Sequence, residues 1–146
     1  SSTNTQVITV NPPITCFQTA YGVTADASDT DGDGMSNTNE CLAGFNPTNN
    51  AAYLHIISVA KTDGTNVTVT YLGASGDNSY AGGPTSRTNI LESTLGTPPD
   101  FANTFVSTGL TNVLSGGTGL GTQATFVDTN GVTNPAKYYR VRVLLP

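Results

Sequence analysis

The residues between positions 29 and 40 form the one pattern in the chain that predicts a specific chemistry. They read DTDGDGMSNTNE, which matches the calcium-loop pattern D-x-[DN]-x-[DN]-G-x5-E at every defined position. In such a loop alternate side chains turn oxygen ligands into one concave turn, a glycine permits the sharp reversal, and the last carboxylate binds with both oxygens. The predicted calcium ligands are Asp29, Asp31, Asp33, the backbone carbonyl of Met35, Asn37 and Glu40.

The alternative interpretation of this segment is an acidic surface loop that holds no metal. Three aspartates and a glutamate at this spacing repel one another unless a cation lies among them, so we favour the calcium site. Zinc is not expected, because the chain has one histidine and two cysteines and a structural zinc site normally needs four ligands.

Outside the loop, few residues could catalyse a reaction. His55 lies in an apolar stretch, where packing accounts for it, and Glu92 is interpreted as a surface charge near a strand end. Acid–base pairs and nucleophile–histidine arrangements each need a second group in a suitable place. We therefore predict that the chain is not an enzyme.

Composition narrows the class of protein and the partners it could have. Only 10% of the 146 residues are charged and the net charge is -5, the wrong sign for binding a phosphate backbone. No apolar run approaches the roughly 18 residues that a bilayer requires. Neither nucleic acid binding nor membrane insertion is expected. The chain opens with Ser1 and Ser2, so we expect a secreted, extracellular protein whose signal has been removed.

The two cysteines, Cys16 and Cys41, flank the predicted calcium loop. An even count in a small chain with few charges favours one disulfide, formed in an oxidising compartment, over a redox or metal-binding pair. Such a bridge would close a loop of about 25 residues and stabilise the fold by roughly 3 kcal/mol.

The pattern along the chain predicts three segments. Residues 1–13 comprise an N-terminal strand at 6–10, QVITV, and a stiff hinge at Pro12 and Pro13, because proline cannot continue a paired strand. Residues 14–50 form a loop module with one short helix from about Asn37 to Leu42 or Ala43, which Gly44 ends. Residues 51–146 form a β-sandwich domain.

The β-sandwich prediction depends on about seven short strands. LHIISVA and VTVTYLG flank the turn at residues 63–66, DGTN, which is typical of a hairpin. Alternation in the last strand predicts that one set of its residues faces the core: Tyr139, Val141, Val143 and Leu145. The other strand candidates are residues 88–92, 104–107, 112–114, 123–128 and 138–145. The predicted fold class is all-β.

The residues DTDGDGMSNTNECLAGFNPTN resemble the loop-helix unit of thrombospondin type 3 repeats and of dockerin-like modules in secreted bacterial proteins. The resemblance covers about 21 residues and implies an EF-hand-like calcium site with the same six ligands. In such proteins the unit often leads into a β-sandwich, which implies an immunoglobulin-like or fibronectin-like domain after it. The chain has one unit rather than two, so docking on a cohesin is not expected.

These features predict a structural subunit of an extracellular, calcium-stabilised filament or surface assembly that polymerises through its N-terminal strand. The expected partners are other copies of the chain. One alternative is a secreted, calcium-dependent carbohydrate-binding or adhesin module with glycans as partners. Its tyrosines could stack on sugars, but the chain has no Trp, so we favour core packing for them. The other alternative is an appended domain of a larger secreted enzyme.

Overall fold

The structure is a computed structural model of the chain, and it describes residues 12–95, 104–133 and 136–145. The predicted N-terminal strand at residues 6–10 lies outside the described residues. The elements described are α1 (Pro12–Tyr21), α2 (Asn37–Ala43), β1 (His55–Thr62), β2 (Asn66–Gly73), β3 (Ser86–Thr94), β4 (Val106–Ser115), β5 (Thr122–Asp128) and β6 (Tyr138–Leu144).

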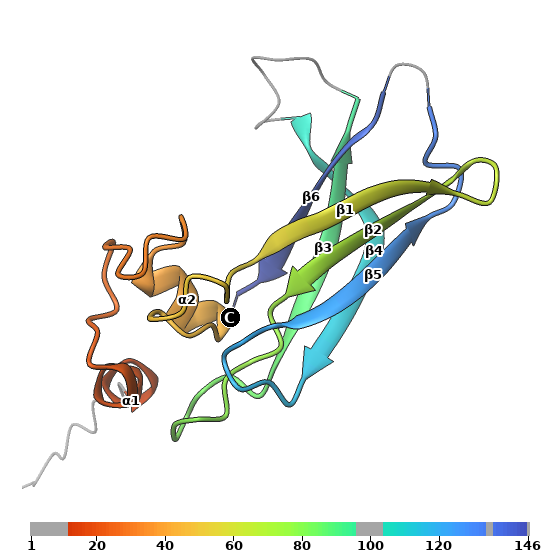
Figure 1. Cartoon of the computed structure of the whole chain (residues 1–146). Coiled ribbons are helices and arrows are strands. Elements are labelled where there is room, and N and C mark those ends of the chain that lie inside the picture. The colour runs from red at the N-terminus through yellow and green to blue at the C-terminus, as the bar shows by residue number, and fades with distance from the viewer. Residues whose placement is uncertain (1–11, 96–103, 134–135, 146) are drawn as a thin grey trace, which may run out of the picture.

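Two antiparallel, three-stranded sheets make up most of the fold, which confirms the all-β class. Their strand orders are β1-β2-β5 and β4-β3-β6, and the two sheets face each other (Figure 1). The buried cluster between them contains Val69 and Tyr71 of β2, Leu91 of β3 and Phe126 of β5. The Tyr71 and Phe126 rings stack with centroids 4.8 Å apart. Burial of these side chains is what holds the two sheets together.

Local sequence accounts for the first hairpin and for the face of the last strand. Asp63 and Gly64, in the three-residue turn between β1 and β2, have positive φ values of 43° and 76°, which tight hairpin turns commonly require. In β6 the alternation is confirmed at Tyr139, Val141 and Val143, which are buried or half-buried. Leu145 follows the end of β6 and is exposed.

Two predictions about strands and helices were wrong. Residues 104–107 and 112–114 are not separate strands, because β4 runs without interruption through Val106–Ser115. Pro12 and Pro13 are not a hinge but the start of α1, because the fixed φ of proline and its missing N–H suit the first turn of a helix. The predicted boundary at residue 13 therefore falls inside α1.

Helix α2 begins and ends where the sequence predicts. Ser36 caps its N-terminus by accepting a hydrogen bond from the Asn39 N–H. Gly44 ends it with a φ of 84°, in the left-handed region that glycine adopts without strain. A Cβ at this position would also lie 2.7 Å from Pro84 and 2.8 Å from Gly76. The glycine therefore both ends the helix and lets the chain pass close to the sandwich.

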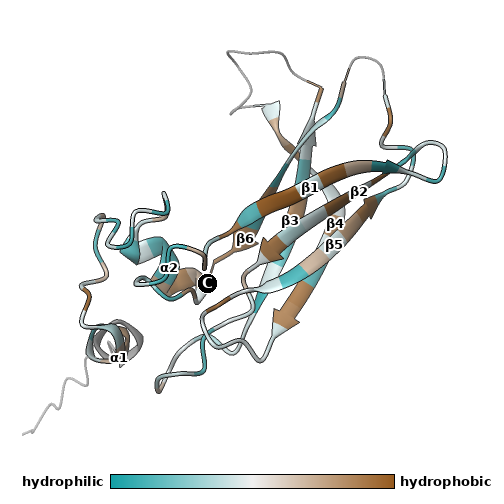
Figure 2. Cartoon of the chain, viewed as in Figure 1, coloured by the Kyte–Doolittle hydropathy of each residue, from teal (hydrophilic) through white to brown (hydrophobic). Residues whose placement is uncertain are grey.

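The loop module is attached firmly to the sandwich. The Arg87 guanidinium on β3 donates to the Leu42 carbonyl at the end of α2, with Nε at 2.7 Å and Nη2 at 2.5 Å. Tyr21 of α1 donates its hydroxyl hydrogen to the buried carboxylate of Asp77. Hydrophobic residues concentrate in the strands and at the inner end of α2, whereas the loop before α2 is hydrophilic (Figure 2). A further buried cluster joins module and sandwich through Ala43, Phe45, Ala52, Ala74 and Val143.

Two individual side chains differ from their sequence interpretation. Glu92 is buried, not a surface charge, and accepts from Arg140 Nε at 2.6 Å and Arg142 Nε at 2.9 Å. The structure gives the predicted Cys16–Cys41 disulfide no support: Cys41 is a buried free thiol, and the side chain of Cys16 lies outside the described residues. Cys41 packs as a small hydrophobic side chain on the inner face of α2.

Among the described residues, neither helix has the length and apolar character needed to cross a membrane.

Candidate metal centre

The loop before α2 is shaped by hydrogen bonds from its backbone to its own aspartates. Asp29 Oδ1 accepts from the Gly32 N–H at 2.7 Å, and Asp29 Oδ2 accepts from the Gly34 N–H at 2.9 Å. Asp33 Oδ1 accepts from the Met35 N–H at 2.7 Å. Gly32 and Gly34 have φ values of 78° and 95°, and open space surrounds both. They are needed for their backbone conformation, which curls the loop around its carboxylates.

This curl brings the three predicted aspartates together. Asp29, Asp31 and Asp33 each offer a carboxylate oxygen, and these oxygens all lie within 4.8 Å of one another. Asp31 Oδ2 and Asp33 Oδ2 are buried and have no hydrogen-bond partner. Carboxylate oxygens with this spacing are the ligands of hard divalent cations. The group can hold a metal ion.

Glu40 is the side chain that most clearly lacks a partner. It projects from α2, its side chain is 0% exposed, and neither Oε1 nor Oε2 has a hydrogen-bond partner. A buried carboxylate without a donor or a cation is costly in free energy. Burial, together with the negative charges of Asp31, Asp33 and Asp29, raises the pKa of Glu40 to about 8. Glu40 is thus influenced by the charges of the aspartates, but it is not among the residues whose carboxylate oxygens all lie within 4.8 Å of one another.

The pKa values of Asp29 and Asp33 are shifted in opposite directions. The hydrogen bond from the Gly34 N–H holds the pKa of Asp29 below its ordinary value. Burial raises the pKa of Asp33, and the charges of Asp31 and Asp29 add to this effect. Negative charge is therefore least compensated at Asp33 of the loop and at Glu40 of α2. A divalent cation would stabilise all four carboxylates in their charged form.

The buried Asn37 side chain has contacts that the sequence pattern does not reveal. Its Nδ2 donates to the Thr24 carbonyl and to Thr30 Oγ1, both at 3.0 Å, and its Oδ1 accepts from the Thr30 N–H at 3.2 Å. Both ends of the amide are therefore engaged in hydrogen bonds within the loop. These contacts hold the loop against the start of α2, whereas the pattern had assigned Asn37 to the metal, directly or through water.

Met35, at the position predicted to supply a carbonyl ligand, also connects the loop to the sandwich. Its N–H bonds to Asp33, so its peptide lies beside the carboxylates. Its side chain packs against the cluster that contains Ala43 and Val143. Met35 therefore connects the loop to the cluster that includes Val143 of β6.

Several titratable groups elsewhere in the described residues make structural contacts. Asp128 accepts from Lys137 Nζ at 2.6 Å and from Tyr139 Oη at 2.8 Å. His55 Nδ1 lies 2.8 Å from the Tyr53 carbonyl, and its ring stacks on Tyr53. Sequence reasoning missed Asp77 and Arg87, which fix the loop module to the sandwich. The contacts that fasten the module, from Tyr21 to Asp77 and from Arg87 to Leu42, each join residues more than 40 positions apart.

Comparison of the chain with protein-family models, curated proteins and solved structures found no match.

Proposed function

We propose that this chain is a structural subunit of an extracellular assembly whose loop module is stabilised by calcium. The observation that carries the proposal is Glu40, fully buried with both carboxylate oxygens unpartnered, near three clustered aspartates. Calcium suits this donor set because it takes six to eight oxygen ligands in a flexible geometry. Asp29, Asp31, Asp33, Glu40 and the Met35 carbonyl are its proposed ligands, with Asn37 bracing the loop or contacting the ion through water.

An extracellular location agrees with this chemistry. Calcium loops of extracellular modules bind with dissociation constants of roughly 0.1 to 1 mM, so they fill only where calcium is abundant. A structural role, rather than an enzymatic one, is supported by the pairing of Glu92, Asp128 and Asp77 in hydrogen bonds and ion pairs that fasten the fold. Two facing sheets with the observed strand order also support an immunoglobulin-like or fibronectin-like sandwich.

Assembly through the N-terminal segment remains the proposed mechanism of polymerisation. Residues 6–10 are rich in β-branched side chains and suit addition to the edge of a sheet in another copy. Because donor and acceptor are different surfaces, the contact does not close on itself and gives a filament.

The proposal is tested by electron microscopy and sedimentation of the purified chain in 10 mM calcium and in EDTA. We expect filaments with calcium and shorter or dissociated material in EDTA. A chain that binds calcium in calorimetry but stays monomeric would overturn the structural role and favour the carbohydrate-binding or adhesin alternative, which a glycan array would then test.

A further inference from the structure

The two long sides of the sandwich differ, and this difference points to a binding site. On one side Asn112 of β4 crosses to the other sheet, donating from Nδ2 to the Thr125 carbonyl of β5 and to Tyr71 Oη, each at 3.0 Å. These bonds close the sandwich between β4 and β5. The opposite side lies between β1 and β6, and there the structure has two pockets.

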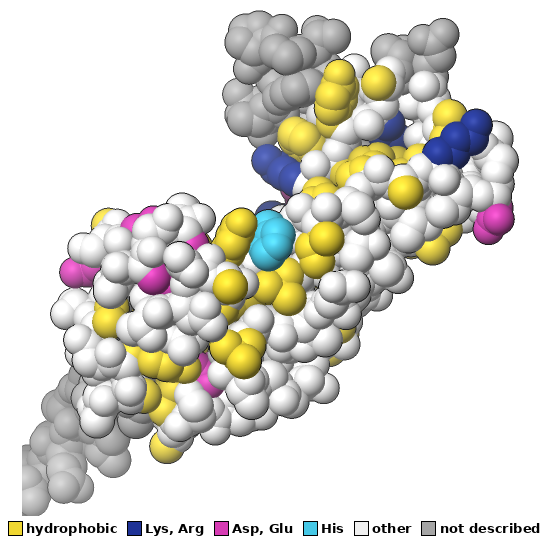
Figure 3. Space-filling view, in the orientation of Figure 1, with side chains coloured by type: hydrophobic (Ala, Val, Ile, Leu, Met, Phe, Trp, Pro, Cys, Tyr) yellow, Lys and Arg dark blue, Asp and Glu magenta, His cyan; other side chains and the backbone are white. Residues whose placement is uncertain are grey.

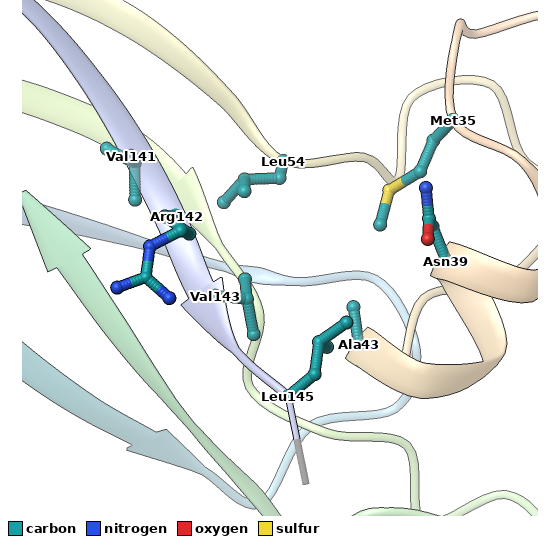
Figure 4. Close-up of a pocket in the computed structure, with 8 residues that line it drawn as sticks. All are labelled: Met35, Asn39, Ala43, Leu54, Val141, Arg142, Val143 and Leu145. Carbon is teal, nitrogen blue, oxygen red and sulfur yellow. The ribbon is translucent and has the colours of Figure 1, made fainter. Parts of the chain in front are cut away.

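The pockets form one groove because both are lined by Leu54 and Val141. One, of about 250 Å³, lies toward α2, and the other, of about 260 Å³, lies further along β1 and β6. Met35, Leu54, Val143 and Leu145 surround the first pocket (Figure 4). Hydrophobic side chains also gather between β1 and β6 on the surface of the molecule (Figure 3). We call this feature the lateral groove and define it by its apolar lining: Met35, Ala43, Leu54, Ile56, Tyr139, Val141, Val143 and Leu145.

The inner face of β1 extends the lateral groove past Ile56, and this extension is uncovered at Val59. Val59 pairs with Val69, so both side chains point to the side of the sheet that faces the core. Val69 is 0% exposed, yet Val59 is 52% exposed. Among the described strands, β6 pairs with β3 and β1 pairs with β2. The groove thus has an apolar floor and a sheet edge along each wall, which is the arrangement that an added strand requires.

The N-terminal segment of the chain has the properties of that strand. Residues 1–10, SSTNTQVITV, contain no charged side chain, so their insertion buries no charge. In an extended segment Ile8 and Val10 project from the same face about 6.7 Å apart. Two apolar side chains on one face of a strand match a groove with two pockets along it, one mostly apolar and one that His55 and Arg140 also line.

A second copy of the chain is the favoured source of the segment that fills the groove. Residues 6–10 are connected through Asn11 to Pro12, where α1 begins. Helix α2 lies between α1 and the strand ends that form the groove (Figure 1), and a helix with its side chains is about 10 Å across. This arrangement favours a segment that is donated by a second copy of the chain.

We propose that residues 6–10 of one copy enter the lateral groove of the next, alongside β6, with Ile8 and Val10 in the two pockets. The proposal rests on the proposed function. The proposed calcium ion would fix the loop that contains Met35, and the side chain of Met35 lines one end of the groove. Main-chain hydrogen bonds to the sheet edge supply affinity, and the two apolar side chains supply register.

The test compares two valines of the same sheet that differ in the face they occupy. Val59 and Val127 are 52% and 49% exposed. Val127 pairs with Thr68, which places it on the outer face of the sheet, away from the groove. In calcium, V59E should remain monomeric, whereas V127E should form filaments like the wild type. Both variants should melt within a few degrees of the wild-type monomer, since both sites are exposed. Filaments of V59E would overturn the groove as the acceptor and leave the structural role intact; a wild type that never assembles would overturn the structural role itself.

A mixing experiment tests the direction of the contact. I8D has a defective donor and an intact groove, while V59E has an intact donor and a defective groove. Each should be monomeric alone, and an equimolar mixture should form a one-to-one dimer that grows no further, measured by sedimentation velocity. The mixture of I8D with V127E is the control, in which I8D should cap and shorten filaments. If I8D polymerises alone, or if the V59E and I8D mixture stays monomeric, insertion of residues 6–10 into the groove is wrong.

Discussion

Replacing Glu40 by glutamine should change stability in opposite directions with and without calcium. The pKa of Glu40 is about 8 in the metal-free fold, against an ordinary value of 4.5. One pKa unit corresponds to about 1.4 kcal/mol, so at pH 7 the buried carboxyl costs the metal-free native state up to about 3 kcal/mol. The neutral amide avoids this cost. We expect E40Q in EDTA to gain about 1 to 3 kcal/mol of unfolding free energy and to melt roughly 2–4 °C higher per kcal/mol.

Calcium should reverse the order of the two proteins. With a dissociation constant of 0.1 to 1 mM, 10 mM calcium stabilises the wild type by about 1.4 to 2.7 kcal/mol. E40Q lacks the carboxylate that we propose as a ligand through both oxygens, so its gain should be close to zero. The assay is thermal melting by circular dichroism in EDTA and in calcium, with D63N as the control. Asp63 lies in the β1–β2 turn, so D63N removes one negative charge without touching the loop.

The stability of the metal-free chain should depend on pH through Glu40. Because the native state of the metal-free chain holds the Glu40 proton more tightly than the unfolded state does, its stability should fall as pH rises from about 4.5 to about 8. E40Q should lack this slope. A variant that melts below the wild type in EDTA would refute the repulsion argument, and a variant that calcium still stabilises fully would refute Glu40 as a ligand.

Three further substitutions test the supports around the site. N112L removes both hydrogen bonds that close the β4–β5 side, so urea unfolding should show a loss of about 1 to 3 kcal/mol; an unchanged midpoint would contradict that role. R87M keeps the apolar stem but frees the end of α2, and calorimetry should show calcium binding several-fold weaker, whereas equal affinity would show that α2 needs no anchor. Burial would raise the pKa of Glu92, but hydrogen bonds from Arg142 and Arg140 outweigh it and hold the pKa below its ordinary value. E92Q should therefore be less stable than the wild type at pH 7, with the gap closing as pH falls below about 4.5; urea curves that stay equally separated down to pH 3 would contradict this.

Sequence predicted the features that depend on neighbouring residues. The cap of α2, its end at Gly44 and the turn at Asp63 and Gly64 are each determined within a few positions, and the structure has them where expected. The three aspartates were found because metal-loop spacing is a local code.

Features that depend on distant contacts were missed or misread. Helix α1 begins with two prolines that suggested a hinge, and it is held by Phe17 and Tyr21 packing against Tyr80. Glu92 was taken for a surface charge because its two arginines lie about 50 positions later in the chain. The lateral groove could not be predicted at all, since it exists only once the strand order leaves β1 and β6 facing each other across an unclosed side.

The double role of Met35 bears on when and where copies of this chain can join. Its backbone lies in the loop that contains the three aspartates, and its side chain lines the lateral groove that we propose as the acceptor. A newly made chain in the calcium-poor interior of a cell would have an unfastened loop and hence a poorly formed acceptor, even though its donor segment is already present. Export into a calcium-rich medium would complete the acceptor after the chain has left the cell. The loop would then act as a safeguard that keeps subunits apart during synthesis and lets them polymerise only outside.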